Sequence, residues 1–479
     1  MRRDELVLAA DLGGSALKLG LVDVRGRLVA ATARALLDRE PEPGAVEQDA
    51  ESWWSAFVDL ARALACGRSD AIAGIALTGA TRCFLLVDRA GVPLAPALMV
   101  RDRRAAAEAE DLAQRLSAET GPIDASHPLA RLAWFARRAP ERLQRAAHLL
   151  EPADFLAFRL TGEVGRDPVR ARRVAGDAVR ELAHRLALPL DLFPPVRPLG
   201  EILGRLRPEP ARLLGLASGV PVVLAPMDAW CASFGVGALR PGRAYASLGS
   251  SLVAGLIVDR PITAPGLPSP MWAEGLWHLG GPGRTGGAVL DRFARLFGCT
   301  TGEFVAEAER EPADADAPFC HPWPDGERVP WRAPALRARL WNLGPETTRG
   351  AIALAVLEGL AFWVRLVLER AEVAAGLRAE TVRISGGLCA SSRLCRLLAE
   401  ALGRRLLRFP AREGALLGAA GLALRALGVF PDLDASSEAL ERAQSPEPIE
   451  PDPEGVARRA RRFACWYQEL GCAASDGEV

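Results

Sequence analysis

Residues 6–24 read LVLAADLGGSALKLGLVDV, and the interpretation of the whole chain depends on this stretch. Two apolar runs of strand length flank a turn of small residues, Gly13–Ser15, which predicts a pair of antiparallel strands. Asp11 stands just before the turn and Lys18 just after it. Lys18 is the only lysine in the chain. A compact ammonium beside a Gly/Ser turn suits an anionic ligand, although an exposed lysine on a hairpin explains the same pattern.

The composition is that of a globular protein with several domains. The chain has 479 residues, of which 49% are hydrophobic and 25% charged, and this length predicts roughly two to four domains. The formal net charge is zero, which excludes the broad positive field that attracts nucleic acid or anionic membranes. The nine cysteines form no CxxC pair and the five histidines no HExxH spacing, so a zinc site is not expected.

The sequence predicts a cytoplasmic protein. The apolar run before Asp11 is too short for a signal peptide, and the cysteines suit a reducing compartment. The longest nearly uncharged run, 220–239, contains two prolines and Asp228, so we interpret it as a buried strand followed by a helix. We therefore expect neither a membrane nor a nucleic acid among the partners.

Strands and helices alternate along the first half of the chain, which predicts an α/β domain with a mostly parallel or mixed sheet. Asp49 is the expected N-cap of a helix whose Trp53, Trp54 and Phe57 recur at helical spacing and belong in a core. The expected strands are the hairpin, 27–35, 72–77, 84–87 and 220–224, and the expected helices are 50–65, 103–117, 129–148 and 229–238.

Asp228 follows the apolar strand 220–224 and precedes a helix. The carboxyl end of a buried strand is where α/β proteins place ligands. An aspartate there is also an ordinary helix N-cap. Both roles are compatible, because a capping carboxylate keeps one oxygen free.

The opening pattern returns in the second half of the chain. Residues 243–259 read RAYASLGSSLVAGLIVD, again two strands around a small-residue turn, which indicates a second domain related by duplication. A third turn, Gly386–Gly387, lies between a strand and a helix, where helix N-terminal amides favour phosphate. Residues 281–286 read GPGRTG but lack a full βαβ unit, so we reject a Rossmann site, while expecting Gly286 near a nucleotide.

These features, taken with further motifs in the same order, resemble the FGGY family of carbohydrate kinases over about residues 6–433. The segment D-L-G-G-S-x-x-K is similar to that family's first phosphate motif. The other matching segments are AVEQD (45–49) with WW (53–54), RDRR (101–104), DFLAFRLTGE (154–163), GERVP (326–330), AVLEG (355–359), the Gly386–Gly387 turn with Ser391, and the segment 413–420.

The resemblance implies an α/β fold of two actin-like (ribonuclease H-like) domains, with mixed sheets flanked by helices and the active cleft between them. We expect an N-terminal domain over 1–240, a C-terminal nucleotide-binding domain over 241–442, and a linker with a final helix over 443–479. That helix packs on its own domain or forms a homodimer contact.

The resemblance also implies ATP-dependent phosphorylation of a sugar or polyol hydroxyl. Asp228 would be the general base, and Asp11 would help to hold Mg²⁺, through water. The residues expected around ATP are Gly13, Gly14, Ser15, Lys18, Gly249, Ser250, Ser251, Gly286, Gly386, Gly387 and Ser391. Those expected at the sugar are Thr81, Arg82, Asp102, Arg104 and Asp228.

Two departures from the family pattern leave alternatives open. The turn before Asp228 is Pro226–Met227 instead of Gly-Gly, which stiffens the backbone there. Arg82 stands where xylulokinases have histidine, so it either binds an acidic sugar or pairs with an acid such as Asp102. The alternative function is a catalytically weak family member that binds nucleotide or sugar as a sensor.

Overall fold

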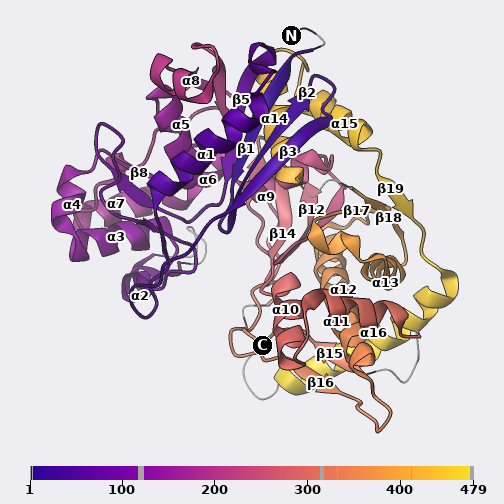
Figure 1. Cartoon of the computed structure of the whole chain (residues 1–479). Helices are drawn as coiled ribbons and strands as arrows, with labels where there is room; N and C mark the ends of the chain where they lie inside the picture. Colours follow the sequence, from indigo (N-terminus) through magenta and orange to yellow (C-terminus); the bar gives the residue numbers. More distant parts are fainter. Residues whose placement is uncertain are drawn as a thin grey trace. The chain divides into compact units, whose positions relative to one another are not determined.

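The computed structural model describes Arg2 and residues 4–116, 123–312, 318–331, 333–410 and 413–474. The chain forms two compact units (Figure 1). Unit 1 comprises Met1–Gly235 and Ala415–Ala443, and unit 2 comprises Val236–Gly414 and Gln444–Val479. Each unit is an α/β structure built on one mixed sheet, as predicted.

The sheet of unit 1 grows outward from the predicted hairpin. Strands β1 and β2 pair antiparallel, and β5 and β10 continue the sheet parallel to β1. The order is β3(Leu28–Ala35), β2(Ala16–Asp23), β1(Leu6–Leu12), β5(Ile72–Gly79), β10(Pro221–Leu224) and β9(Ile202–Arg205). Every residue of β1 except Asp11 is buried, because both faces of this strand are covered, as is usual for strands with parallel neighbours.

Helices cover the sheet of unit 1. Helix α1(Ala50–Ala65) is capped by Asp49, whose carboxylate accepts the Glu51 N–H at 3.1 Å, and its Trp53 and Phe57 are buried as predicted. The other helices of this part are α5(Pro152–Thr161), α6(Pro168–Ala171), α8(Pro208–Leu214) and α9(Asp228–Gly235).

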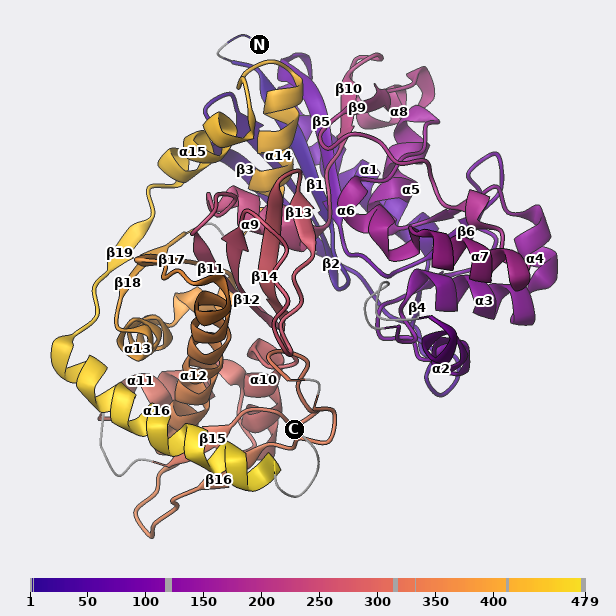
Figure 2. The same cartoon turned by 180° about the vertical axis from the view of Figure 1, so that it is seen from behind.

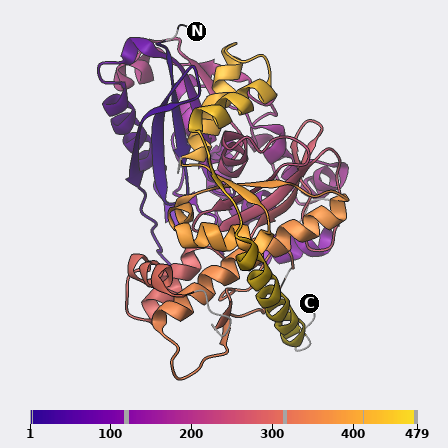
Figure 3. The same ribbon diagram turned by 90° about the vertical axis from the view of Figure 1, so that its right-hand side faces the viewer.

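Two helices from late in the chain complete unit 1. The sequence placed residues up to 442 in the second domain, whereas α14(Gly414–Ala426) and α15(Leu433–Gln444) lie beside β1 and β3 (Figures 1 and 3). A Cβ on Gly20 of β2 would lie 2.8 Å from Leu28 Cδ1 of β3 and 3.3 Å from Leu416 Cδ1 of α14, so a side chain there would press on both. This glycine therefore makes room for a helix nearly 400 residues away in sequence.

A smaller layer of helices and short strands extends unit 1. The helix expected over 129–148 is instead α3(Pro128–Arg138), α4(Pro140–Arg145) and a strand, β8(His148–Leu150), which pairs with β6(Leu85–Val87). Pro140 disfavours helical geometry at the preceding residue and thereby ends α3. The helix expected over 103–117 is α2(Ala106–Arg115), and residue 117 lies outside the described residues. The remaining elements are β4(Glu47–Gln48), β7(Ala97–Leu98) and α7(Asp177–Arg185).

Unit 2 repeats the hairpin-plus-parallel-strand arrangement. Strand β11 pairs antiparallel with β12 and parallel with β17. The order is β13(Met271–Ala273), β14(Leu276–Pro282), β12(Leu252–Val258), β11(Ala244–Leu248), β17(Thr381–Ser385), β18(Arg405–Arg408) and β19(Glu447–Ile449). The other elements are α10(Gly287–Leu296), α11(Thr301–Arg310), β15(Phe319–His321), β16(Arg339–Trp341), α12(Arg349–Ala375) and α13(Ser392–Leu402).

Helix α12 forms the centre of unit 2. By length and composition alone it could cross a membrane, but 83% of its most apolar stretch is buried, and its two sides pack on the sheet and on α11 and α13.

The predicted linker after residue 442 is partly structured. Strand β19 pairs antiparallel with β18 at the edge of the sheet. The final helix, α16(Pro453–Ala474), packs on unit 2 through buried ion pairs of Arg459 and Arg462 with Glu358 of α12.

Candidate functional site

Asp11 and Lys18 face each other across the opening hairpin. They are Cα partners on β1 and β2, and Thr78 of β5 is the partner of Asp11 on the other side. The turn between them closes with a hydrogen bond from the Gly13 N–H to the Ala16 carbonyl at 3.0 Å. A Cβ at Gly14 would meet no atom within 4 Å, so a ligand can approach the backbone there.

Gln48 holds this turn in place, a role that the sequence analysis did not assign. Its Nε2 donates to the Gly14 carbonyl at 2.8 Å, and its Oε1 accepts the Trp53 indole N–H at 2.7 Å. Gln48 belongs to the AVEQD segment, which was noted only as a motif.

Asp228 begins α9, and the Pro226–Met227 turn before it is firmly anchored. The Pro226 carbonyl accepts the Thr78 hydroxyl at 2.5 Å. Asp228 Oδ1 accepts the Ala229 N–H at 2.6 Å; Asp228 is the first residue of α9 and bonds to the adjacent residue, which is not the N-cap bond to the second or third helical N–H that the sequence suggested. Oδ2 has no hydrogen-bond partner among the described residues, which leaves one oxygen for a ligand.

The carboxyls of Asp11 and Asp228 interact electrostatically. Burial, followed by the charge of Asp228, raises the pKa of Asp11 to about 7, while Lys18 opposes this change. Burial raises the pKa of Asp228 to about 6, with a smaller contribution from Glu151. Two carboxyls that disfavour each other's charge form a site that a cation would stabilise.

The donor set at Asp11 fits Mg²⁺. Its Oδ1 is buried and has no hydrogen-bond partner among the described residues. Those residues contain no cluster of three or more metal-binding side chains. Mg²⁺ is commonly held by one or two carboxylates together with water and substrate phosphates, so a pair of aspartates is sufficient.

Arg82 adopts a left-handed backbone conformation, with φ of +62°. Its N–H donates to Glu151 Oε1 at 2.6 Å, and its guanidinium pairs with Asp124 at 3.0 Å. Of the open alternatives, pairing with an acid is thus observed, but the partner is Asp124 and not Asp102. Thr81, the preceding residue, is half-buried.

Asp102 and Arg104 belong to a buried charge network. Asp102 Oδ1 accepts Arg131 Nη1 at 2.9 Å, and Oδ2 accepts Arg104 Nη2 at 2.6 Å and the Val46 N–H at 2.9 Å. Arg104 also pairs with Glu47 at 2.6 Å. These contacts satisfy both carboxylate oxygens of Asp102. Its side chain also has no exposed surface, so it cannot contact a substrate directly.

In unit 2, the turn 249–251 packs on the N-terminus of α10. The Gly287 and Ala288 N–H groups donate to the Gly249 and Ser250 carbonyls at 2.9 and 3.0 Å. Gly286 has φ of +145°, and a Cβ there would lie 2.7 Å from the Ser250 carbonyl oxygen. This position therefore requires glycine.

The third turn, Gly386–Gly387, lies at the same end of the unit 2 sheet as the turn 249–251. A Cβ on Gly386 would lie 2.6 Å from the Leu248 carbonyl oxygen, whereas one on Gly387 would meet nothing within 4 Å. The predicted nucleotide turns of unit 2 thus come together, with Gly387 facing open space. Ser391 caps α13, and its hydroxyl donates to Glu309 Oε1 at 2.7 Å.

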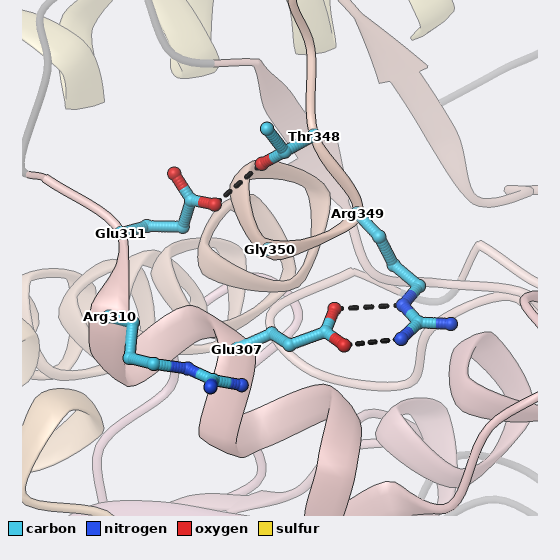
Figure 4. A pocket seen from close by; sticks show the side chains of 6 residues that line it. All are labelled: Glu307, Arg310, Glu311, Thr348, Arg349 and Gly350. Carbon is cyan, nitrogen blue, oxygen red and sulfur yellow. Dashed lines mark hydrogen bonds and ion pairs between the residues drawn. The ribbon is translucent and has the colours of Figure 1, made fainter.

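A groove of about 460 Å³ lies where α11 ends and α12 begins (Figure 4). Glu307 forms a two-point ion pair with Arg349, and the Thr348 hydroxyl donates to Glu311 at 2.5 Å. These four side chains are already paired with one another, so we assign them to the junction of the two helices.

Comparison with known proteins identifies the class of this chain. The N-terminal domain of the FGGY family of carbohydrate kinases matches residues 6–235, and the C-terminal domain matches residues 244–427. The chain belongs to this family, and it is a carbohydrate kinase, an enzyme of the class that the resemblance implied.

Individual relatives span almost the whole chain. It is 28% identical to the xylulose kinase of Escherichia coli K12 over 97% of this chain and 99% of that protein. It is 30% identical to the glycerol kinase of Thermus brockianus over 89% and 92%. The crystal structure of gluconate kinase from Lactobacillus acidophilus, 23% identical, has a TM-score of 0.86 and covers 98% of each chain, which shows a shared fold.

Proposed function

We propose that this kinase transfers the γ-phosphoryl group of ATP to a hydroxyl of a neutral sugar or polyol, with Asp228 as the general base. One observation carries the proposal: Asp11 on β1 and Asp228 at the start of α9, which follows β10 of the same sheet, are half-buried carboxyls, and the charge of Asp228 raises the pKa of Asp11 beside the Gly13–Ser15 turn. Such a pair combines a cation site with a proton acceptor.

Asp228 would accept the hydroxyl proton on Oδ2 as the substrate oxygen bonds to phosphorus and the bond from phosphorus to the leaving ADP oxygen breaks. The Ala229 N–H holds Oδ1, so the carboxylate has a defined orientation. With a pKa of about 6, Asp228 is mostly deprotonated near neutral pH and still able to take a proton.

Asp11 would hold Mg²⁺, through water, which neutralises phosphate charge when bound. Lys18 would add positive charge beside the phosphates, and it also limits the rise in the pKa of Asp11. Gln48 would keep the Gly14 backbone in position for the phosphates through its 2.8 Å hydrogen bond.

The turns of unit 2 would bind the nucleotide. Gly249, Ser250 and Ser251 would surround phosphate, with Gly286 packed beneath them, and the open side of Gly387 would receive the nucleoside. The Ser391 hydroxyl already bonds to Glu309, so we assign Ser391 to the shape of this turn.

A neutral substrate fits the charges around Arg82 better than an acidic one. Asp124 pairs with the guanidinium and Glu151 accepts the backbone N–H, so the positive charge of Arg82 is already compensated. A sugar carboxylate would need an uncompensated cation. Relatives named xylulose kinase and glycerol kinase agree with neutral substrates. Asp102 would act indirectly, by holding the Arg104 guanidinium in place.

The test is a coupled ADP-release assay over ketoses, polyols and sugar acids. We expect turnover with a neutral compound, and a fall in kcat of about 10²- to 10⁴-fold for Asp228→Asn with ATP binding retained. Asp59→Asn, which changes an exposed acid on α1, is the matched control. ATP binding without turnover on any substrate would contradict the proposal and favour a sensor instead.

A further inference from the structure

A second groove in unit 1, of about 540 Å³, contains none of the residues proposed for phosphoryl transfer. It lies among the first turns of α1, the end of α5, the start of α8 and the loop 89–92. Figures 1 and 2 show these three helices grouped on one side of the unit 1 sheet. Its volume is in the range of small-molecule sites.

Two guanidinium groups line this groove without a carboxylate partner. Neither Arg89 nor Arg207 forms an ion pair within the described part of the chain; the one side-chain hydrogen bond of Arg207 is weak, at 3.4 Å to the Arg159 carbonyl. Arg159 itself is neutralised by Glu51 at 2.6 Å and lies 4.8 Å above the Trp54 ring. The groove therefore has a fixed wall and two guanidinium groups that form no ion pair within the described part of the chain.

The remaining wall suits an organic group that carries hydroxyls. Trp54 and Phe158 provide aromatic surface, and Glu209 is an exposed acceptor without an ion pair among the described residues. Burial lowers the pKa of His148, so this ring is neutral at pH 7 and adds no third cation.

We propose that this groove binds the phosphomonoester of a small polyhydroxy compound. Two guanidinium groups can donate to several oxygens of a phosphate at once, whereas a carboxylate offers them only two oxygens. The volume exceeds what a lone phosphate fills, and Glu209 can accept a hydroxyl. The proposal does not depend on the kinase activity of the chain.

The groove is separate from the groups proposed for catalysis. Glu151, which holds Arg82, precedes the first residue of α5, whereas Arg159 is near the end of this helix. Ten helical residues span about 15 Å. A ligand in the groove would thus contact the far end of the helix that supports the substrate residues.

Binding is measured by calorimetry with glycerol 3-phosphate, inorganic phosphate and glycerol as probes. The test variant is Arg89→Gln with Arg207→Gln. The matched control is Arg68→Gln with Arg145→Gln, two exposed arginines of the same unit. Thermal unfolding and kinase turnover, expected to be unchanged in both, establish that the variants are folded.

We expect glycerol 3-phosphate to bind the wild type and the control equally, and the groove variant at least about tenfold more weakly. Inorganic phosphate should bind more weakly than the ester, and glycerol not measurably. A binding event that both variants retain belongs to another site. The proposal is overturned if the two variants bind alike, or if phosphate binds as tightly as its ester.

Discussion

Replacing Asp11 by asparagine should stabilise the metal-free protein while it weakens catalysis. Asparagine preserves the size of the side chain and removes the charge that faces Asp228. The cost of that charge is visible in the pKa of Asp11, which burial and Asp228 raise from 3.8 to about 7. A functional carboxylate that is costly in the empty protein is expected where a bound cation later compensates it.

The sign and size of the effect follow from linkage. Because the folded pKa of Asp11 is raised, the unfolded chain releases this proton first as pH increases, so the folded state loses stability between about pH 4 and pH 7. The difference from 3.8 to about 7 corresponds to at most about 4 kcal/mol. Asp11 is only partly shielded from solvent, and Asp228 shares the cost of the repulsion. We therefore expect Asp11→Asn to raise the free energy of unfolding by about 1 to 3 kcal/mol above pH 7 and by little at pH 4.

The assay is urea unfolding without Mg²⁺ at pH 4.5 and pH 8, followed by amide-exchange protection of the peptide that covers β1 and β2. Adding Mg²⁺ should stabilise the wild type more than the variant. Asp59→Asn should change the free energy of unfolding by less than about 0.5 kcal/mol. An Asp11→Asn protein no more stable than wild type at pH 8, or equally stabilised at both pH values, would refute the reasoning.

Three further outcomes are expected. The value of kcat/KM should fall about tenfold per pH unit below about pH 6, where Asp228 is protonated; a pH–rate profile that stays flat to pH 5 contradicts this. Gly387→Ala should weaken ATP binding but leave folding unchanged. Gly386→Ala should lower the thermal unfolding midpoint, because Gly386 has φ of +107° and its new Cβ would lie 2.6 Å from a carbonyl oxygen. Equal midpoints for the two variants would contradict the assignment. Glu358→Gln should lower the free energy of unfolding by about 3 to 5 kcal/mol, because Arg459 and Arg462, both buried, lose their ion pairs with Glu358 and Arg459 keeps only the longer pair with Glu400 at 3.3 Å. Amide exchange in α16 should increase as well; unchanged exchange would be the contrary result.

Local patterns were enough to predict most elements of the fold. The hairpin of β1 and β2 and the helix α1 follow from apolar periodicity and from caps such as Asp49, which act within a few residues. The strand β19 was missed because its Pro and Glu composition is that of a linker, and it is a strand only because β18 offers it an edge. The packing of α14 on unit 1 depends on contacts such as Leu416 with Gly20, which no local pattern reveals.

The site could be predicted where one short motif contains both a functional residue and the residues that surround it in the fold. Asp11 and its turn belong to one hairpin, so their proximity followed from the strand pairing. The partner of Arg82 lies 42 residues away, and several acids were equally plausible from the sequence. The tertiary fold pairs Arg82 with Asp124, while Asp102 pairs with Arg131.

The late placement of α14 and α15 bears on how the protein is made. Unit 1 begins at the first residue but is completed only by residues 415–443. During translation, the first 235 residues therefore lack α14 and α15 until nearly the whole polypeptide has been synthesised. A fragment that ends with α9 would lack α14 and α15 altogether. We therefore expect an exchange of N-terminal halves between related enzymes to give insoluble proteins unless the segment 415–443 is exchanged as well.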